Sequence, residues 1–384
     1  MTGRSVLLIT AIATAACSPV AVNVDSIADR YVRAALQLAQ HDPALVEDWR
    51  GPDRFRPGPR GPVAEVAREI ESLQDAIEMA ASDISSSQEY ARVHYLMAQL
   101  GGLRFAAERQ LGRATSIDEQ AREEFGVTFP PLDQAAVERA RSALNEALPG
   151  FGGLKERVLA FRKQTLIPTA DRQQVLTEAL QSCRAATIAV VPLPRDEAVS
   201  FVLGAPVLFD AFARYRGDHR TEIELSAGPL DTARAHRLAC HEGYPGHHVQ
   251  HVLIDRLFAE RQWPELQLTP AFGPHLLYLE GAAEVGADLA LTPSRIDVLL
   301  QELQPVITDV ARAYLDAGLS QDRALDRLAN EALVSDPAGM LALIEQRRAR
   351  ALVYVEGRRL IYERLKTKSL GGLYDAFASV AAVQ

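Results

Sequence analysis

The chain has 384 residues, of which 48% are hydrophobic and 24% charged, so a folded protein with a sizeable core is expected and a disordered one is excluded. Its 41 lysines and arginines are outnumbered by 50 aspartates and glutamates, which gives a formal net charge of -9. Because no dense basic patch stands against this acidic balance, we expect no nucleic-acid partner.

The first residues have the pattern of a secretory signal. Arg4 precedes the apolar run Val6–Ala16, which is too short to span a bilayer but suits a signal peptide. Thr14-Ala15-Ala16-Cys17 resembles a bacterial lipobox, in which the cysteine is lipidated, although leucine is usual at the position of Thr14. Residues 1–17 are therefore predicted to be a signal peptide, and the mature chain a periplasm-facing lipoprotein of the cell envelope. Ser18 favours the outer membrane, and plain cleavage near Ala16, leaving a soluble periplasmic protein, is the alternative.

Helical periodicity covers most of the remaining chain. The predicted helices are Val24–Ala39, Val63–Ala81, Gln88–Leu111, Leu132–Leu148, Ala170–Val190, Leu230–Glu242, His247–Arg261, His275–Ala290, Ser294–Ala317, Gln321–Val334 and Pro337–Thr367. No later segment reaches the roughly 18 apolar residues of a transmembrane helix. We therefore expect contact with the membrane only through a lipid on Cys17.

Two short stretches predict strands instead. Ala198–Leu203 is apolar and rich in strand formers, and Thr221–Ala227 alternates apolar and charged residues. The predicted fold is mainly α, with a small β-sheet beside the metal helix whose free edge could pair with an extended peptide. A weak joint near Ile167 divides an N-terminal helical region (18–166) from a C-terminal metal-site region (167–384), and we expect the two to pack as one compact unit.

A cluster of histidines carries the chemistry. Five of the nine histidines fall between His236 and His251, around the segment HEGYPGHH that begins at His241. Zinc prefers imidazole and carboxylate ligands, and a catalytic zinc site keeps one position for water. The usual HExxH spacing is absent, because Pro245 stands four residues after His241. Pro245 and its flanking glycines predict a break in the helix, which would return His247 to the same metal.

Two carboxylates complete the predicted site. Glu280 and Glu284 lie one helical turn apart, and we interpret Glu280 as the third ligand and Glu284 as a hydrogen-bond partner of a ligand histidine. Glu242 is the predicted general base. The pair His247 and His251, also four residues apart, is an alternative metal pair that leaves Glu242 without a role. His248 is expected to support the site or the substrate.

These residues resemble a known family. The segments His241–Gln250, Glu280-Gly281 and Tyr354–Ile361 resemble the "domain of unknown function 885" family, which is similar to helical gluzincin metallopeptidases. The resemblance implies His241, His247 and Glu280 as zinc ligands, Glu242 as base, and Tyr354 facing the site. Ala282 replaces the usual aromatic residue, and Ala287 stands where an acidic residue is common, with Asp288 following. These departures concern the substrate pocket more than the metal site.

The sequence therefore predicts a zinc hydrolase with one Zn²⁺ per chain. Its substrate would be a peptide or a small peptide-like amide, with Tyr354 first and His248 second as donors to the oxyanion. Another ester or amide substrate is also consistent with the motif. A non-catalytic metal-binding or structural envelope lipoprotein is the alternative of a different class. Cys183 and Cys240 permit a disulfide in an oxidising compartment, although Cys240 is read first as a small buried helix residue.

Overall fold

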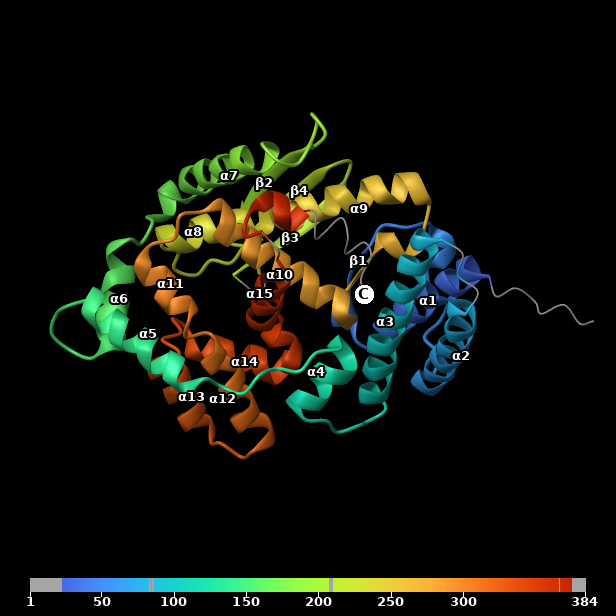
Figure 1. Cartoon of the computed structure of the whole chain (residues 1–384), viewed down its shortest axis with the longest axis horizontal. Coiled ribbons are helices and arrows are strands. Elements are labelled where there is room, and N and C mark those ends of the chain that lie inside the picture. Colours follow the sequence, from blue (N-terminus) through green and yellow to red (C-terminus); the bar gives the residue numbers. More distant parts are fainter. Residues whose placement is uncertain (1–22, 83, 85, 207–209, 366, 375–384) are drawn as a thin grey trace, which may run out of the picture.

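The computed structural model describes residues 23–82, 84, 86–206, 210–365 and 367–374. The predicted signal peptide and its Cys17 lie outside the described residues. In Figure 1, α1 to α3 form one end of the molecule, α5 and α6 the other, and α10 and α15 lie between them. None of the described helices combines the length and the apolar character that crossing a bilayer requires.

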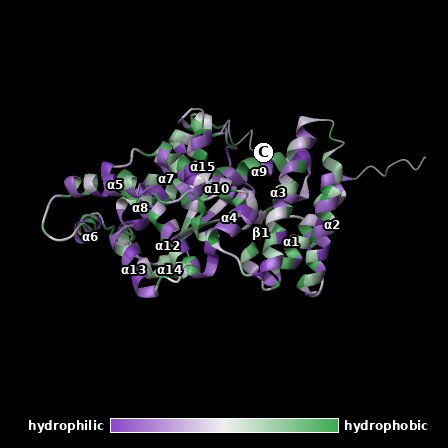
Figure 2. Cartoon of the chain, turned by 60° about the horizontal axis from the view of Figure 1, so that its bottom comes forward, coloured by the Kyte–Doolittle hydropathy of each residue, from purple (hydrophilic) through white to green (hydrophobic). Residues whose placement is uncertain are grey.

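The described chain is mainly helical, as predicted. The α-helices are α1 (Val24–Ala39), α2 (Val63–Ala81), α3 (Ser87–Gln110), α4 (Ile117–Phe125), α5 (Gln134–Ala147), α6 (Leu154–Gln164), α7 (Arg172–Ile188), α8 (Thr232–Leu238), α9 (His247–Arg261), α10 (Gly273–Ala290), α11 (Arg295–Gln301), α12 (Pro305–Asp316), α13 (Gln321–Asn330), α14 (Pro337–Arg347) and α15 (Val353–Arg364). The first two and α9 have the predicted bounds. Most of the helices show both hydrophilic and hydrophobic residues along their length (Figure 2), as packing on one face requires.

Two long predicted helices are broken in the structure. The predicted segment 294–317 divides into α11 and α12, because Pro305 lacks an N–H donor and begins a new helix. The predicted segment 337–367 divides at a 3₁₀ turn, Arg348–Leu352, where Arg348 has a positive φ of 51°. The predictions of single helices over these segments were therefore wrong.

Two small sheets accompany the helices. The first has the order β2-β4-β3, with β2 (Ala198–Leu203) parallel and β3 (Ala211–Gly217) antiparallel to β4 (Arg220–Leu225). The strand predicted from Thr221 is thus the central strand, and the expectation that it offers a free edge was wrong. Strand β3 lies at one edge of this sheet, and it was not predicted from the sequence.

The second sheet joins the two regions of the chain. β1 (Val46–Trp49) pairs antiparallel with β5 (Leu268–Pro270), which directly precedes α10. The same regions meet at a pair of glycines, where a Cβ on Gly102 would lie 2.6 Å from the Cα of Gly273. The N-terminal region thereby contributes a strand to the surroundings of α10.

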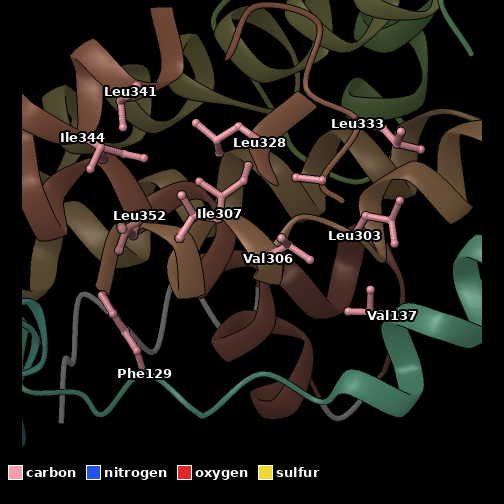
Figure 3. Close-up of a cluster of buried hydrophobic side chains, with 14 of the residues drawn as sticks. Phe129, Val137, Leu303, Val306, Ile307, Leu328, Leu333, Leu341, Ile344 and Leu352 are labelled. Carbon is pink, nitrogen blue, oxygen red and sulfur yellow. The ribbon is translucent and has the colours of Figure 1, made fainter. Parts of the chain in front are cut away.

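The hydrophobic core is divided into several clusters. The largest combines residues of α4 and α5 with residues of α10 to α15, and Figure 3 shows Val137 and Phe129 below the side chains of the C-terminal helices. A second cluster fills the space between α1, α2 and α3 and includes Phe272 just before α10. A third cluster lies under the β2-β4-β3 sheet and includes Cys183 and Tyr244. Helix α10 contributes to the clusters on several sides and is almost entirely buried.

Candidate metal centre

The predicted helix break between the two histidines is present. Helix α8 continues into a π-helical turn, Ala239–Gly243, and α9 begins at His247. The Gly246 N–H donates to the Cys240 carbonyl oxygen over 3.0 Å. A Cβ on Gly246 would lie 1.6 Å from the His241 carbonyl oxygen, so no side chain fits at this position. This tight return brings the His247 imidazole back to the His241 imidazole, with ring centroids 4.8 Å apart.

Glu280 completes the cluster. Its Oε2 atom lies 3.3 Å from His241 Nε2 and 3.3 Å from His247 Nε2. The three ligand atoms lie within 4.8 Å of one another. Glu280 Oε2 is nevertheless a buried atom without a hydrogen-bond partner among the described residues. A buried polar atom without a partner is costly, and a cation between the three atoms would satisfy it. Two imidazoles and one carboxylate form a donor set that fits zinc.

Hydrogen bonds hold His247 in an orientation suitable for a metal ligand. The Gln250 amide donates to the Leu279 carbonyl oxygen over 2.9 Å, so its Oε1 faces His247 Nδ1 at 2.8 Å. His247 Nδ1 therefore carries the proton, and the lone pair of Nε2 points to the cluster.

The Glu284 carboxylate lies behind His241. Its Oε1 is 3.2 Å from His241 Nδ1, and its other oxygen contacts Arg237. Arg237 also donates to Asp288 over 2.7 Å, and Asp288 accepts from Arg358 over 2.7 Å. Asp288 and Glu284 of this helix thus both balance Arg237. The side chain of His241 is therefore supported by a row of alternating charges, formed by Glu284, Arg237, Asp288 and Arg358.

Electrostatics at the cluster favour a cation. Burial lowers the pKa of His241, but Glu280 and Glu284 outweigh it and hold the pKa well above its ordinary value. Burial raises the pKa of Glu280, but the neighbouring His247 and His241 lower it to about 2. The carboxylates therefore stabilise positive charge at the place where the three ligand atoms meet.

The alternative metal pair is not supported by the geometry. His251 stacks on Tyr215, with centroids 5.0 Å apart and ring planes 15° apart. Burial, followed by the positive charge of Arg50, holds the pKa of His251 well below its ordinary value. Within the described chain, the metal-competent group contains His247 and omits His251.

Glu242 lies beside the cluster on the cavity wall. The side chain is buried, and the backbone of Ala213 on β3 is near enough to its carboxylate to favour the ionised form. Burial raises the pKa of Glu242, while His241 and His247 lower it. A buried carboxylate of raised pKa next to the ligands can act as a proton acceptor.

Tyr354 lines the same cavity from α15. Its ring centroid is 6.2 Å from that of His241. The crossing of α10 and α15 that brings Tyr354 here depends on two glycines, since a Cβ on Gly357 would lie 2.4 Å from the Leu277 carbonyl oxygen. The small residue Gly281 therefore serves the close approach to α15.

His248 lies elsewhere. It is fully buried, with Nδ1 2.8 Å from Thr221 Oγ1 and Nε2 3.2 Å from Glu197 Oε2. It is absent from the residues that line the metal cavity. Both ring nitrogens are engaged, so the prediction of His248 as a donor to the substrate is corrected to a support for the turn.

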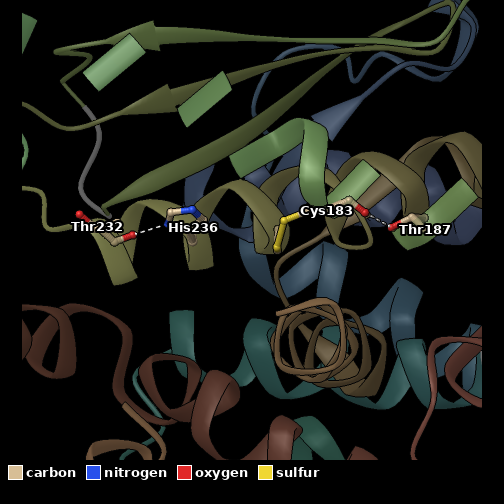
Figure 4. Close-up of a disulfide and its surroundings, with 5 residues drawn as sticks. Cys183, Thr187, Thr232 and His236 are labelled. Carbon is tan, nitrogen blue, oxygen red and sulfur yellow. Dashed lines mark hydrogen bonds between the residues drawn. A yellow bond between two sulfur atoms is a disulfide. The ribbon is translucent and has the colours of Figure 1, made fainter. Parts of the chain in front are cut away.

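Cys183 and Cys240 form a disulfide, with Cα atoms 5.5 Å apart. Figure 4 shows the bond between α7 and the segment that follows α8, with Thr187 donating to the Cys183 carbonyl oxygen. Because Cys240 immediately precedes His241, the crosslink fixes the backbone of a ligand residue. The disulfide thus links the turn from His241 to His247, called the metal turn below, covalently to α7.

One carboxylate of the cavity, Glu47, could not be recognised from the sequence. Glu47 lies on β1 and lines the cavity together with Glu242, Glu280 and Tyr354. The local sequence offers no motif that indicates this role, because only the pairing of β1 with β5 brings Glu47 to α10.

Comparisons with known proteins concern the fold. No protein-family model matches the chain, and no curated protein matches it. A crystal structure of a candidate lipoprotein from Colwellia psychrerythraea is similar, with a TM-score of 0.54 and 16% identity over 84% of this chain and 68% of that one. A structure of a candidate lipoprotein of unknown function from Shewanella oneidensis gives a TM-score of 0.46 and 13% identity over 78% and 66%. This chain spans about two thirds of the length of both proteins. What it shares with the Colwellia protein is the fold.

Proposed function

We propose that this chain is a zinc-dependent hydrolase of the cell envelope that cleaves peptide or peptide-like amide bonds. The observation that carries the proposal is the convergence of His241 Nε2, His247 Nε2 and Glu280 Oε2 beside Glu242. We also propose, from the three sequence motifs, that the chain is related to the "domain of unknown function 885" family and its gluzincin-like architecture.

A zinc ion held by His241, His247 and Glu280 would supply Lewis-acid activation of a water molecule. Glu242 then accepts the proton of the attacking water and delivers it to the leaving amine. The Tyr354 hydroxyl donates to the developing oxyanion.

The edge of β3 supports a peptide substrate over a compact one. Ala211, Phe212 and Ala213 line the cavity, and β3 pairs only with β4 in the described sheet. An extended peptide can add to such an edge by main-chain hydrogen bonds. A peptide lying there would pass Glu242, because Ala213 and Glu242 line the same cavity.

The experiment combines metal content with one conservative variant. We expect about one zinc per chain, measured by mass spectrometry on protein purified without a metal-affinity column, and its loss in a His241→Ala/His247→Ala double variant. Glu242→Gln should keep the zinc and lower peptide hydrolysis by about 10²- to 10⁴-fold. A Glu242→Gln variant with full zinc and full activity would contradict the mechanism.

A second candidate function is that of a non-catalytic envelope lipoprotein. The fold likeness to a protein described as a candidate lipoprotein supports the envelope and lipoprotein part of the proposal, and favours this second candidate over hydrolysis. The test is the mass of the mature N-terminus, which should carry a lipid on Cys17. Lipidated protein that neither contains nor takes up zinc would establish the second candidate in place of the first.

A further inference from the structure

Glu47 is placed in the metal cavity by an irregularity of its strand. The pairing of β1 with β5 shifts register between Val46, opposite Pro270, and Asp48, opposite Thr269. Glu47 is the residue at this shift, and such a bulge redirects a side chain. Its side chain is exposed to solvent and lines the cavity that also holds Glu242 and Glu280.

The cavity has an excess of negative charge. Glu47, Glu242 and Glu280 line it, and no lysine or arginine is among the described lining residues. A divalent cation at the cluster would leave one net negative charge when all three carboxyl groups are ionised. Arg347 acts on Glu47 at longer range and donates to the Ala44 carbonyl oxygen, and it does not line the cavity.

Glu47 has no role in the proposed hydrolysis mechanism. His241, His247 and Glu280 hold the metal, and Glu242 moves the proton. Among the described residues, Glu47 forms no salt bridge within 4.0 Å, in contrast to Asp48, which contacts Arg50 over 3.3 Å. A carboxylate that faces a substrate cavity without a close cationic partner is suited to bind a cation that arrives with the substrate.

We propose that Glu47 binds a protonated amine of the substrate, so that the cavity prefers peptides with a free amino group near the scissile bond. The inference rests on the proposed hydrolase function and names its substrate class. The absence of a lining arginine or lysine among the described residues disfavours recognition of a substrate carboxylate. The amine can be the N-terminal group or a lysine side chain, and the two sources share one chemistry.

The test uses the zinc-loaded full chain and a pool of synthetic octapeptides. Half of the peptides contain lysine, and each is made with a free and with an acetylated N-terminus. Hydrolysis is followed by mass spectrometry. We expect wild-type protein to cleave free-amine peptides about 10- to 100-fold faster than acetylated ones, and Glu47→Gln to abolish this preference. If lysine is the group bound, acetylated peptides with lysine keep the advantage over those without it.

A binding experiment separates this inference from the proposed function. The inactive Glu242→Gln protein, loaded with zinc and immobilised, should retain free-amine peptides in preference to acetylated ones, and the Glu242→Gln/Glu47→Gln double variant should not. Retention that depends on Glu47 without hydrolysis by wild-type protein would support the inference and reject the hydrolase. Equal treatment of free and acetylated peptides together with equal treatment of lysine-containing and lysine-free peptides in both experiments, or no retention at all, would overturn the inference.

Asp48→Asn is the matched control. It removes one carboxylate from the same strand, and this carboxylate contacts Arg50 over 3.3 Å. Asp48 does not line the metal cavity. We expect Asp48→Asn to keep the preference for free amines. Loss of this preference in both Glu47→Gln and Asp48→Asn would indicate a general effect of charge and would overturn the role of Glu47.

Discussion

Gly281 on α10 lies so close to Gly357 on α15 that a Cβ built on Gly281 would be 2.4 Å from the Gly357 carbonyl oxygen. Gly281 follows the proposed metal ligand Glu280 directly, and Gly357 comes one turn after Tyr354. The contact between the two glycines therefore sets the distance between a ligand and the proposed oxyanion donor.

Gly281→Ala should separate the two helices. We expect a loss of about 1–3 kcal/mol in the free energy of unfolding from overpacking, together with weaker zinc binding. The measurements are urea unfolding and zinc competition with a chelating dye. Gly101→Ala is the control, because a Cβ there meets nothing within 4 Å on α3, and it should be neutral or slightly stabilising. Equal effects of the two substitutions would refute the role of the crossing.

Glu284→Gln tests the support of His241. The variant removes the charge that faces His241 Nδ1 and Arg237 while keeping the side-chain shape. We expect zinc affinity to fall about 10- to 100-fold. Dialysis against graded chelator concentrations measures this change. Glu146→Gln, at an exposed position on α5, should bind zinc as the wild-type protein does.

Tyr354→Phe tests the oxyanion donor. Loss of the hydroxyl should lower kcat by about 10²-fold or more and leave the zinc content at one per chain. The ring remains to fill the cavity wall near His241, so the free energy of unfolding should change little. If zinc were lost along with activity, Tyr354 would act in holding the site together and not in stabilising the oxyanion.

Glu197 makes the fold sensitive to acid. Burial raises its pKa, but hydrogen bonds from His248, Tyr244 and Arg184 outweigh burial and lower the pKa to about 2. Because the pKa is lower in the folded chain than in the unfolded one, the stabilisation is present above about pH 4.5 and is lost as the pH falls toward 2. Its upper bound is about 3 kcal/mol.

Urea unfolding at pH 6 and pH 3 measures this effect. Wild-type protein should lose stability between the two values, and Glu197→Gln should be less stable at pH 6 and lose less on acidification. Glu222→Gln, which removes an exposed partner of Arg216 on the same sheet, should change stability by less than about 0.5 kcal/mol. An unchanged acid dependence in Glu197→Gln would show that other carboxylates control it.

The disulfide is expected to hold the metal turn. It closes a sequence separation of 57 residues, for which chain entropy predicts a stabilisation of about 4 kcal/mol. Cys183→Ala/Cys240→Ala should therefore lower the free energy of unfolding and weaken zinc binding at His241. Wild-type protein treated with a reductant should behave as the double variant does. Zinc affinity that is unaffected by either treatment would contradict the tethering role.

The metal cluster could be predicted because its signal is local. His241, Glu242 and His247 lie within seven residues, and the glycines and proline between them predict the break that the structure contains. Glu280 and Glu284 were recognisable from their spacing on one helix. A role for each side chain could be proposed, since metal chemistry restricts the ligands to few residue types.

Glu47 could not be predicted in this way. The segment Val46–Trp49 is four residues long and carries two acids, so it has no strand pattern of its own. It becomes a strand only by pairing with Leu268–Pro270, far along the chain. Helix α4 was missed for a different reason, since it has nine residues and many charges. Its capping pattern, Ser116 followed by Glu119, was a signal that could have revealed it.

The pairing of β1 with β5 also determines when the cavity can form. A chain that emerges N-terminus first presents Glu47 early, but the strand that aims this side chain into the cavity ends at Pro270. Contacts between such distant segments close large loops and form late in folding. The part of the cavity that Glu47 lines is therefore completed after the turn His241–His247 has emerged. A partly emerged chain can contain both histidines of this turn before the cavity is complete.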